Sequence, residues 1–237
     1  MNKRLKRLWA KRSSSSWIEY LRNDGMKIGE GTVFYCKPFE MLIDTTRPWL
    51  IEIGKNVQIT RGVTILTHGF DWSSLKAKYA DINGSSGKVK IGDNCFIGMN
   101  TTILKGTIIG DNVIVGAGSV LTGKEYPSDT VVAGNPARVI CSLDEYHNKR
   151  LASQKEEAKE LVLEFYKAYK TKPSKNVLSE FFWLFEKRGE ITEPSFNSQM
   201  KVMNNYEASF QKFLETEPEF NGFEEFLDYC FNETENN

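Results

Sequence analysis

Aliphatic residues recur at intervals of six along the middle of the chain. The spacing is unbroken over Ile91, Ile97, Ile103, Ile109, Val115 and Leu121, and an earlier stretch repeats it at Ile53, Ile59 and Ile65. An amphipathic α-helix requires apolar spacings of three and four, and a half-buried strand requires a spacing of two. A period of six instead predicts a solenoid of short strands and tight corners, whose stacked coils share one aliphatic core.

The register divides the chain into three parts. Coils are predicted over residues 28–142, with a register break between Phe34 and Leu50 and a second break over 67–88. Because the distance from Ile65 to Ile91 is not a multiple of six, the solenoid must eject 67–88 as a loop, and such loops commonly carry function. Residues 1–27 read as a basic, helical segment. Beyond residue 143 the apolar spacing becomes helical, with one stripe over 177–185, so 143–237 is predicted to be an α-helical extension. The fold class is therefore mainly β.

Bulk composition excludes several classes of protein. The 237 residues are 40% apolar and 26% charged, with a formal net charge of zero, and no nucleic-acid-binding motif is visible. No apolar run is long enough for a membrane span, and the basic N-terminus lacks the apolar region of a secretory signal. Four scattered cysteines without CxxC spacing argue against a zinc site and a disulfide framework. The simplest interpretation is a cytoplasmic protein.

The N-terminal segment combines an apolar helical face with basic residues. Leu5, Leu8 and Trp9 share that face, and the surrounding cations are Lys3, Arg4, Lys6, Arg7, Lys11 and Arg12. A solvated terminus is the simpler interpretation. A weak peripheral contact with an anionic membrane surface is the alternative, since each basic residue near such a surface adds about 1 kcal/mol.

Two histidines limit any mechanism that needs an imidazole. His147 stands at the start of the helical extension, where a solvated role is expected, whereas His68 stands at the mouth of the ejected loop. An imidazole can take a proton from a hydroxyl group near neutral pH and return it. His68 is therefore the candidate general base.

Two runs of sequence carry a resemblance to a known family. The run IEIGKNVQITRGVTILTHGFDWS, residues 51–73, and the coils of residues 88–140, which end in GNPARVI, resemble the hexapeptide-repeat acetyltransferases. Within that family the chain is most similar to enzymes that O-acetylate sugars of capsules and surface polysaccharides. The resemblance covers residues 28–142 and implies a left-handed parallel β-helix. It also implies acetyl-CoA as co-substrate, no metal, and a homotrimer whose cofactor groove lies between subunits.

The resemblance also implies roles for individual residues. His68 matches the general base, and Asp44 matches a residue that lines the acceptor site, although a turn residue is an equal interpretation. Asp71 is expected to orient His68 or bind a sugar hydroxyl, and Trp72 offers a flat face to a sugar ring. The positions that match contacts to acetyl-CoA are Gly98, Met99, Ala117, Thr122, Lys124 and Arg138. Lys124 departs from the family pattern because Gly123 intervenes after Thr122.

The predicted function is transfer of an acetyl group from acetyl-CoA to a sugar hydroxyl in the synthesis of a capsular or surface polysaccharide. Two alternatives stay open at this point. One is N-acetylation of an amino sugar or a small-molecule antibiotic, and the other is a non-catalytic β-helix scaffold.

Overall fold

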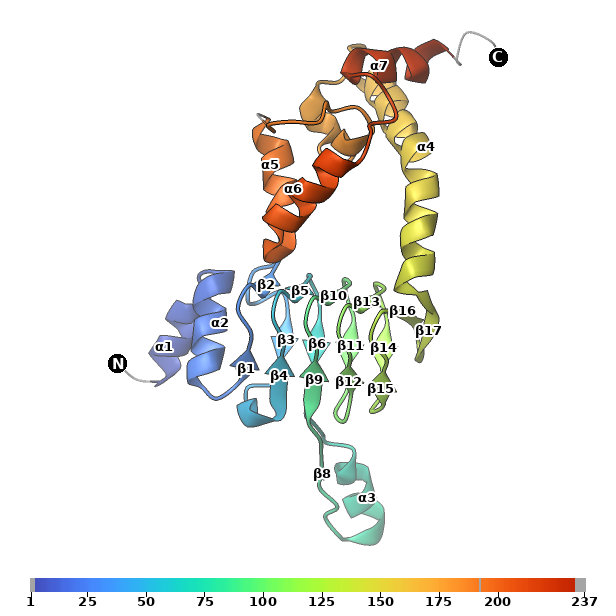
Figure 1. The fold of residues 1–237 in the computed structure, drawn as a ribbon. Helices are drawn as coiled ribbons and strands as arrows, with labels where there is room; N and C mark the ends of the chain where they lie inside the picture. Colours follow the sequence, from blue (N-terminus) through green and yellow to red (C-terminus); the bar gives the residue numbers. More distant parts are fainter. Residues whose placement is uncertain (1–2, 192, 233–237) are drawn as a thin grey trace. The chain divides into compact units, whose positions relative to one another are not determined.

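The computed structural model describes residues 3–191 and 193–232. The chain divides into two compact units, Met1–Tyr146 and His147–Asn237. The first unit is built of short strands preceded by two helices, and the second is helical (Figure 1). None of the helices in the described ranges is long and apolar enough to cross a membrane.

Short parallel strands form the three flat sides of a left-handed β-helix, as predicted. The first sheet contains β1 (Lys27–Ile28), β4 (Ile51–Ile53), β9 (Val89–Ile91), β12 (Ile108–Ile109) and β15 (Glu125–Tyr126). The second contains β2 (Val33–Phe34), β5 (Gln58–Ile59), β10 (Phe96–Ile97), β13 (Ile114–Val115), β16 (Thr130–Gly134) and β17 (Ala137–Ser142). The third contains β3 (Leu42–Ile43), β6 (Thr64–Ile65), β11 (Thr102–Ile103) and β14 (Val120–Leu121).

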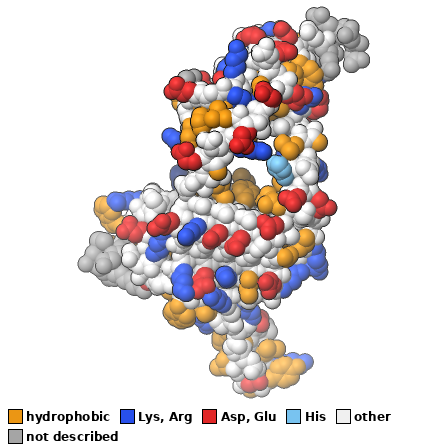
Figure 2. All heavy atoms as spheres, viewed as in Figure 1, with side chains coloured by type: hydrophobic (Ala, Val, Ile, Leu, Met, Phe, Trp, Pro, Cys, Tyr) orange, Lys and Arg blue, Asp and Glu red, His pale blue; other side chains and the backbone are white. Residues whose placement is uncertain are grey.

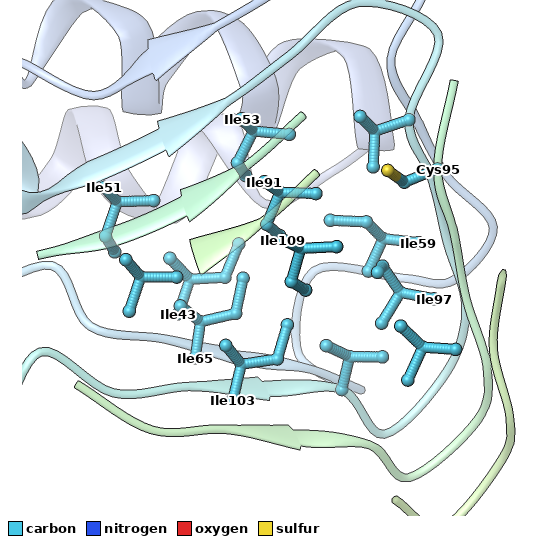
Figure 3. Packing of buried hydrophobic residues seen from close by; sticks show 14 of the residues in the cluster. Ile43, Ile51, Ile53, Ile59, Ile65, Ile91, Cys95, Ile97, Ile103 and Ile109 are labelled. Carbon is cyan, nitrogen blue, oxygen red and sulfur yellow. The ribbon is translucent and has the colours of Figure 1, made fainter. Parts of the chain in front are cut away.

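Each hexapeptide points its aliphatic residue into the core, where that side chain is buried. Ile91, Ile97 and Ile103 fall in the first, second and third sheets, so three hexapeptides complete one coil. Parallel pairing then places Ile109 directly beside Ile91 in the next coil. The aliphatic side chains stack inside the solenoid in three columns (Figure 3). Burying such columns is the main stabilising term of the fold.

Asparagine forms the corner between the first and second sheets. Asn56, Asn94 and Asn112 adopt φ values of 53°, 55° and 56°, a left-handed conformation that asparagine tolerates better than most residues. Their amides form a ladder: Asn56 donates to Asn94 over 3.2 Å and Asn94 donates to Asn112 over 3.1 Å. Asn112 donates in turn to the Asp129 carboxylate over 2.8 Å. The corner is therefore held by the same stacking that holds the core.

The two register breaks have different structures. Across Phe34–Leu50 the coil does not stop, because β3 lies within this stretch and pairs with β6. Extra residues before and after β3, including the 3₁₀ turn η1 (Pro48–Leu50), separate β3 from its neighbouring strands by more than six residues. The spacing of six therefore does not detect this strand. The second break does leave the coil, from His68 onward. Its strands β7 (His68–Gly69) and β8 (Ser85–Ser86) pair antiparallel, and helix α3 (Trp72–Tyr79) lies between them in the sequence. This loop projects from the β-helix (Figure 1).

Two helices precede the first coil, α1 (Lys3–Ala10) and α2 (Ser14–Asn23). Ser13 caps α2 by accepting a hydrogen bond from the Ser16 backbone N–H over 3.2 Å. The buried face of α2 consists of Trp17, Ile18 and Leu21, which pack into the β-helix core. Met1, Asn2 and the side chains of Lys3, Arg4 and Lys6, which belong to the predicted basic segment, lie outside the described residues.

The last coil ends in a hairpin, since β17 runs antiparallel to β16. Helix α4 (Leu143–Tyr169) follows. The remaining elements are η2 (Lys175–Leu178), η3 (Phe182–Leu184), α5 (Pro194–Met200), η4 (Val202–Asn204), α6 (Tyr206–Glu215) and α7 (Phe223–Asn232).

One predicted helical stripe in the second unit is wrong. Residues 177–185 form 3₁₀ turns instead of one α-helix. Phe182 stacks on Phe196 with ring centroids 4.6 Å apart, and Phe185 stacks on Phe226 at 5.4 Å. Contacts with two separate helices therefore replace the single face that an α-helix would present.

Replacing an inward isoleucine should destabilise the β-helix far more than replacing its outward neighbour. Ile109 is 1% exposed and Ile108, in the same strand, is 42% exposed. We expect Ile109→Ala to lower the free energy of unfolding by about 2–5 kcal/mol, because it leaves a cavity in the column, and Ile108→Ala by less than about 1 kcal/mol. Denaturant unfolding followed by the β-sheet circular dichroism signal measures both. Equal losses would contradict the assignment of these two faces.

Candidate active site

His68 lies where the chain leaves the third sheet. Strand β6 ends at Ile65, and His68 begins the short strand β7 that carries the chain into the projecting loop. Its imidazole is half-buried, and Nδ1 lies 2.7 Å from Oδ2 of Asp44. No hydrogen bond from the other ring nitrogen, Nε2, is formed within residues 3–191 and 193–232. The ring is therefore held through Nδ1, while the side chain keeps 21% of its surface exposed.

The pairing of β3 with β6 brings Asp44 to His68. Leu42 pairs with Thr64 and Ile43 with Ile65, so the residues that follow these two strands are neighbours. The backbone N–H of Asp44 also donates to the Ile65 carbonyl over 3.0 Å. A parallel register thus joins two residues that are far apart in the sequence.

Two threonines hold the Asp44 carboxylate, which is 7% exposed. Thr46 donates its backbone N–H and its hydroxyl to Oδ1, over 2.9 and 2.6 Å. The Thr67 hydroxyl donates to Oδ2 through a short hydrogen bond, and the Thr67 backbone N–H donates over 3.3 Å. The sequence pattern did not identify either threonine as part of the site. The only available signal was their place in the sequence, with Thr46 two residues after Asp44 and Thr67 directly before His68.

These contacts determine the charge of Asp44. Burial raises the pKa of its carboxyl group, but hydrogen bonds from Thr46, Thr67 and His68 outweigh burial and hold that pKa well below its usual range. An ionised carboxylate can only accept hydrogen bonds, so the proton of the neutral imidazole is placed on Nδ1. The lone pair of Nε2 then faces away from Asp44 and is available to take a proton.

Of the two candidate aspartates, Asp44 is the one that orients His68. Asp71 lies at the start of α3, where its backbone carbonyl accepts the Ser74 N–H over 3.2 Å. It makes no hydrogen bond with His68 in the described chain. The predicted role of Asp44 in lining the acceptor site stays a prediction, and its position behind the imidazole gives it a contact that the motif match did not specify.

A row of aromatic rings leads from His68 into the loop. The Phe70 ring is 6.2 Å from the His68 ring, edge to face, and 5.4 Å from the Trp72 ring. Phe70 is 68% exposed, while Trp72 is half-buried beneath it. Exposed rings next to a polar site are suited to binding the apolar face of a sugar.

The residues predicted to contact acetyl-CoA fall at two corners of the coil and on the final hairpin. Gly98, Met99 and Ala117 lie at the corner between the second and third sheets, which we call the Met99 corner. A side chain at Gly98 would lie 2.6 Å from the Ala117 backbone nitrogen, so this position requires glycine. Met99 is exposed, and its carbonyl accepts the Gly118 N–H over 2.7 Å.

Thr122 and Lys124 lie at a different corner, between the third and first sheets, on the same side of the coil as His68. The Thr122 backbone N–H donates to the Tyr126 hydroxyl over 3.2 Å, and the Lys124 ammonium lies 5.1 Å from the Tyr126 ring. On the hairpin, Arg138 is exposed, and its guanidinium donates to the carbonyls of Ala137 and Pro136 over 2.9 and 3.4 Å. Within the described chain, no group of three or more His, Cys, Asp or Glu side chains could hold a metal ion.

Comparisons with known proteins agree with this architecture. The family described as "Bacterial transferase hexapeptide (six repeats)" matches residues 88–123. The "Galactoside O-acetyltransferase" of Escherichia coli is 32% identical over 60% of this chain and 68% of its own length. The "Putative lipopolysaccharide biosynthesis O-acetyl transferase WbbJ" of Escherichia coli is 30% identical over 51% of this chain and 74% of its own length.

A further relative shares the coils over a smaller part of its length. The "Putative acetyltransferase YvoF" of Bacillus subtilis is 38% identical over 52% of this chain. The chain spans 64% of the length of that protein.

Acid should remove the stability that the Asp44 carboxylate contributes. Because the folded pKa lies below the ordinary value of about 3.9, this contribution is present above about pH 4 and is lost as the pH falls through the folded pKa. We expect the difference in unfolding free energy between the wild type and Asp44→Asn to be largest above about pH 5 and to shrink below about pH 4. Denaturant unfolding at a series of pH values measures it. A difference that grows in acid would contradict the ionised, hydrogen-bonded carboxylate.

Proposed function

Because the chain belongs to the hexapeptide-repeat acetyltransferase family, we propose that it transfers an acetyl group from acetyl-CoA to a hydroxyl group of a saccharide. One observation carries the proposal: a buried carboxylate holds Nδ1 of the partly exposed His68, and Nε2 makes no hydrogen bond with the described residues. An imidazole arranged in this way is suited to remove a proton from a hydroxyl group. The projecting loop beside it provides aromatic rings for the acceptor.

The reaction we propose is a direct transfer in which His68 moves one proton. Nε2 takes the proton of the acceptor hydroxyl as its oxygen forms a bond to the thioester carbonyl carbon. The C–S bond then breaks, and the imidazolium returns the proton to the departing thiolate, which leaves an acetyl ester and free CoA. Asp44 stabilises the imidazolium between these two steps through the 2.7 Å contact. General-base catalysis of this kind is worth about 10²- to 10⁴-fold in rate.

The acceptor we favour is a neutral sugar of a capsular or surface polysaccharide. Phe70 and Trp72 give the site two adjacent rings, and Asp71 begins the helix beside them. The names of two relatives refer to a galactoside and to lipopolysaccharide biosynthesis. We propose that Asp71 and Trp72, which lie in the same loop as His68, bind this acceptor.

The placement of the cofactor residues favours a trimer. His68 and the Met99 corner lie at different corners of the triangular coil, so one bound molecule needs a second subunit to contact both. In a ring of three subunits, the corner of one coil meets a face of the next. We therefore place acetyl-CoA between subunits, beside Gly98, Met99, Ala117, Thr122, Lys124 and Arg138.

The outward side chains indicate which faces meet in that trimer. Four of the five outward residues of the first sheet are charged, namely Lys27, Glu52, Lys90 and Glu125, and the fifth is Ile108. Lys27 and Lys88 are paired to Glu52 over 2.7 and 2.6 Å. In strands β2, β5, β10 and β13 of the second sheet the corresponding positions are uncharged: Val33, Gln58, Phe96 and Ile114. The exposed Arg138 lies on β17, at the end of this sheet. The third sheet presents Leu42, Thr64, Thr102 and Val120, which are also uncharged. Charged side chains are spread over the visible face of the β-helix (Figure 2). Uncharged faces are the ones that subunits bury.

Loss of the imidazole should abolish the reaction without abolishing binding. We expect His68→Ala to lower turnover of a neutral saccharide by at least about 10²-fold and to leave the affinity for acetyl-CoA nearly unchanged. Transfer of labelled acetyl groups measures the first quantity, and calorimetry measures the second. The exposed His147 supplies the control, and His147→Ala should be fully active.

Two results of that experiment would contradict the proposal. If His147→Ala were inactive and His68→Ala active, the general base would be misassigned. If the wild type acetylated amino sugars and left neutral sugars unmodified, the reaction would be N-acetylation.

A charge on an uncharged face should dissociate the trimer. Phe96, on the second sheet, and Ile108, on the first, are each 42% exposed in the single chain. We expect Phe96→Glu to shift the wild-type trimer toward monomers because it buries an unpaired carboxylate, while Ile108→Glu stays trimeric. Light scattering during size-exclusion chromatography gives both masses. A monomeric, active wild type, or dissociation by Ile108→Glu alone, would overturn this arrangement.

A further inference from the structure

Helix α1 presents an apolar face that is largely exposed among the described residues of the first unit. Leu5, Leu8 and Trp9 are 51%, 63% and 61% exposed. Their spacing of three and four residues places them on one side of the helix. Such a group of large apolar side chains at one edge of a protein is typical of an interaction surface.

The opposite side of the segment is anchored. Ala10 packs against the β-helix core, and α2 buries Trp17 and Ile18 in the same core. The backbone N–H of Phe34 also donates to the Ser14 hydroxyl over 3.1 Å, which fixes the start of α2 to the first coil. The exposed face of α1 is therefore the side directed away from the body of its unit.

The sequence around this face is rich in basic residues and contains no acidic residue. Six of the first twelve residues are lysine or arginine, and the first acidic residue in the sequence is Glu19. Arg7 and Arg12 are exposed, and the Arg12 guanidinium lies 5.0 Å from the Trp9 ring. The whole chain has a formal net charge of zero, so the excess of positive charge is local.

We propose that α1 docks the protein onto an anionic membrane surface, with Leu5, Leu8 and Trp9 inserted at the level of the headgroups. A short helix with leucine and tryptophan on one face and cations beside it lies in the interface of a bilayer without crossing it. Tryptophan prefers this depth because its ring is apolar and its N–H is polar. The local positive charge selects anionic lipids. This inference is independent of the acetyl transfer, since none of these residues touches His68 or Asp44.

The experiment uses the full chain and vesicles of two compositions. One contains phosphatidylcholine alone, and the other contains about 30 mol % phosphatidylglycerol, which supplies the negative surface potential. Co-flotation should show binding to the anionic vesicles only, and high salt should weaken it because exposed charges are screened.

Paired variants separate the apolar and the ionic contributions. Leu8→Ala with Trp9→Ala should weaken vesicle binding by about tenfold or more, because it removes the inserted side chains. Arg7→Gln and Arg12→Gln should each weaken it by about fivefold. The matched controls are Trp49→Ala, which removes another exposed tryptophan, and Lys90→Gln, which removes a cation from the first sheet. Both should bind like the wild type.

Several outcomes would overturn the proposal. These are no binding to either vesicle, equal binding to both, or binding that the Leu8→Ala, Trp9→Ala variant retains in full. Another is a change in oligomeric mass caused by this variant, since that would show that a second copy of the chain covers the face. Acetyl transfer to a soluble acceptor should be unchanged by the variant, so a failure here is distinguishable from a failure of the proposed activity.

Discussion

The inward aliphatic side chain at every sixth residue is the constraint on which this protein depends. Each hexapeptide supplies one short strand and one corner, and the strand is too short to be stable alone. Stacking stabilises each strand, because Ile91, Ile97 and Ile103 each lie between equivalent side chains of the two neighbouring coils. The asparagine ladder at one corner repeats with the same period. Core and corner therefore require the same register.

A register this strict has a direct consequence for the site. Residues in excess of the period must be accommodated outside the stacked strands, and from His68 onward the second break does so as a projecting loop. The site is built where the ejected loop meets the rigid scaffold. Thr67 is fully buried and belongs to the coil, whereas Phe70 is largely exposed and belongs to the loop. His68 stands between them, with its Nδ1 side held by the scaffold and its Nε2 side directed elsewhere.

The same scaffold explains why the carboxylate of Asp44 is charged although it is buried. Taking a carboxylate out of water is unfavourable unless hydrogen bonds replace the water. Thr46 follows Asp44 by two residues, and Thr67 arrives through the pairing of β3 with β6. The resulting cluster fixes the tautomer of His68, which is the property a general base needs. The membrane-facing surface proposed for α1 uses no part of this cluster.

The sequence by itself determined the β-helix, the ejected loop and the position of His68, because all three follow from a period that can be counted along the chain. It also indicated two helical ends, since the apolar spacing changes there. Only the tertiary structure decided that Asp44 contacts His68. The extra residues around β3 break the spacing of six, so the sequence pattern does not predict that β3 pairs with β6. The 3₁₀ turns over 177–185 also emerged only in the tertiary structure, where Phe182 and Phe185 contact α5 and α7. The spacing of apolar residues indicates which face of a segment is buried. It does not indicate which other segment packs against that face, because this depends on how distant parts of the chain come together.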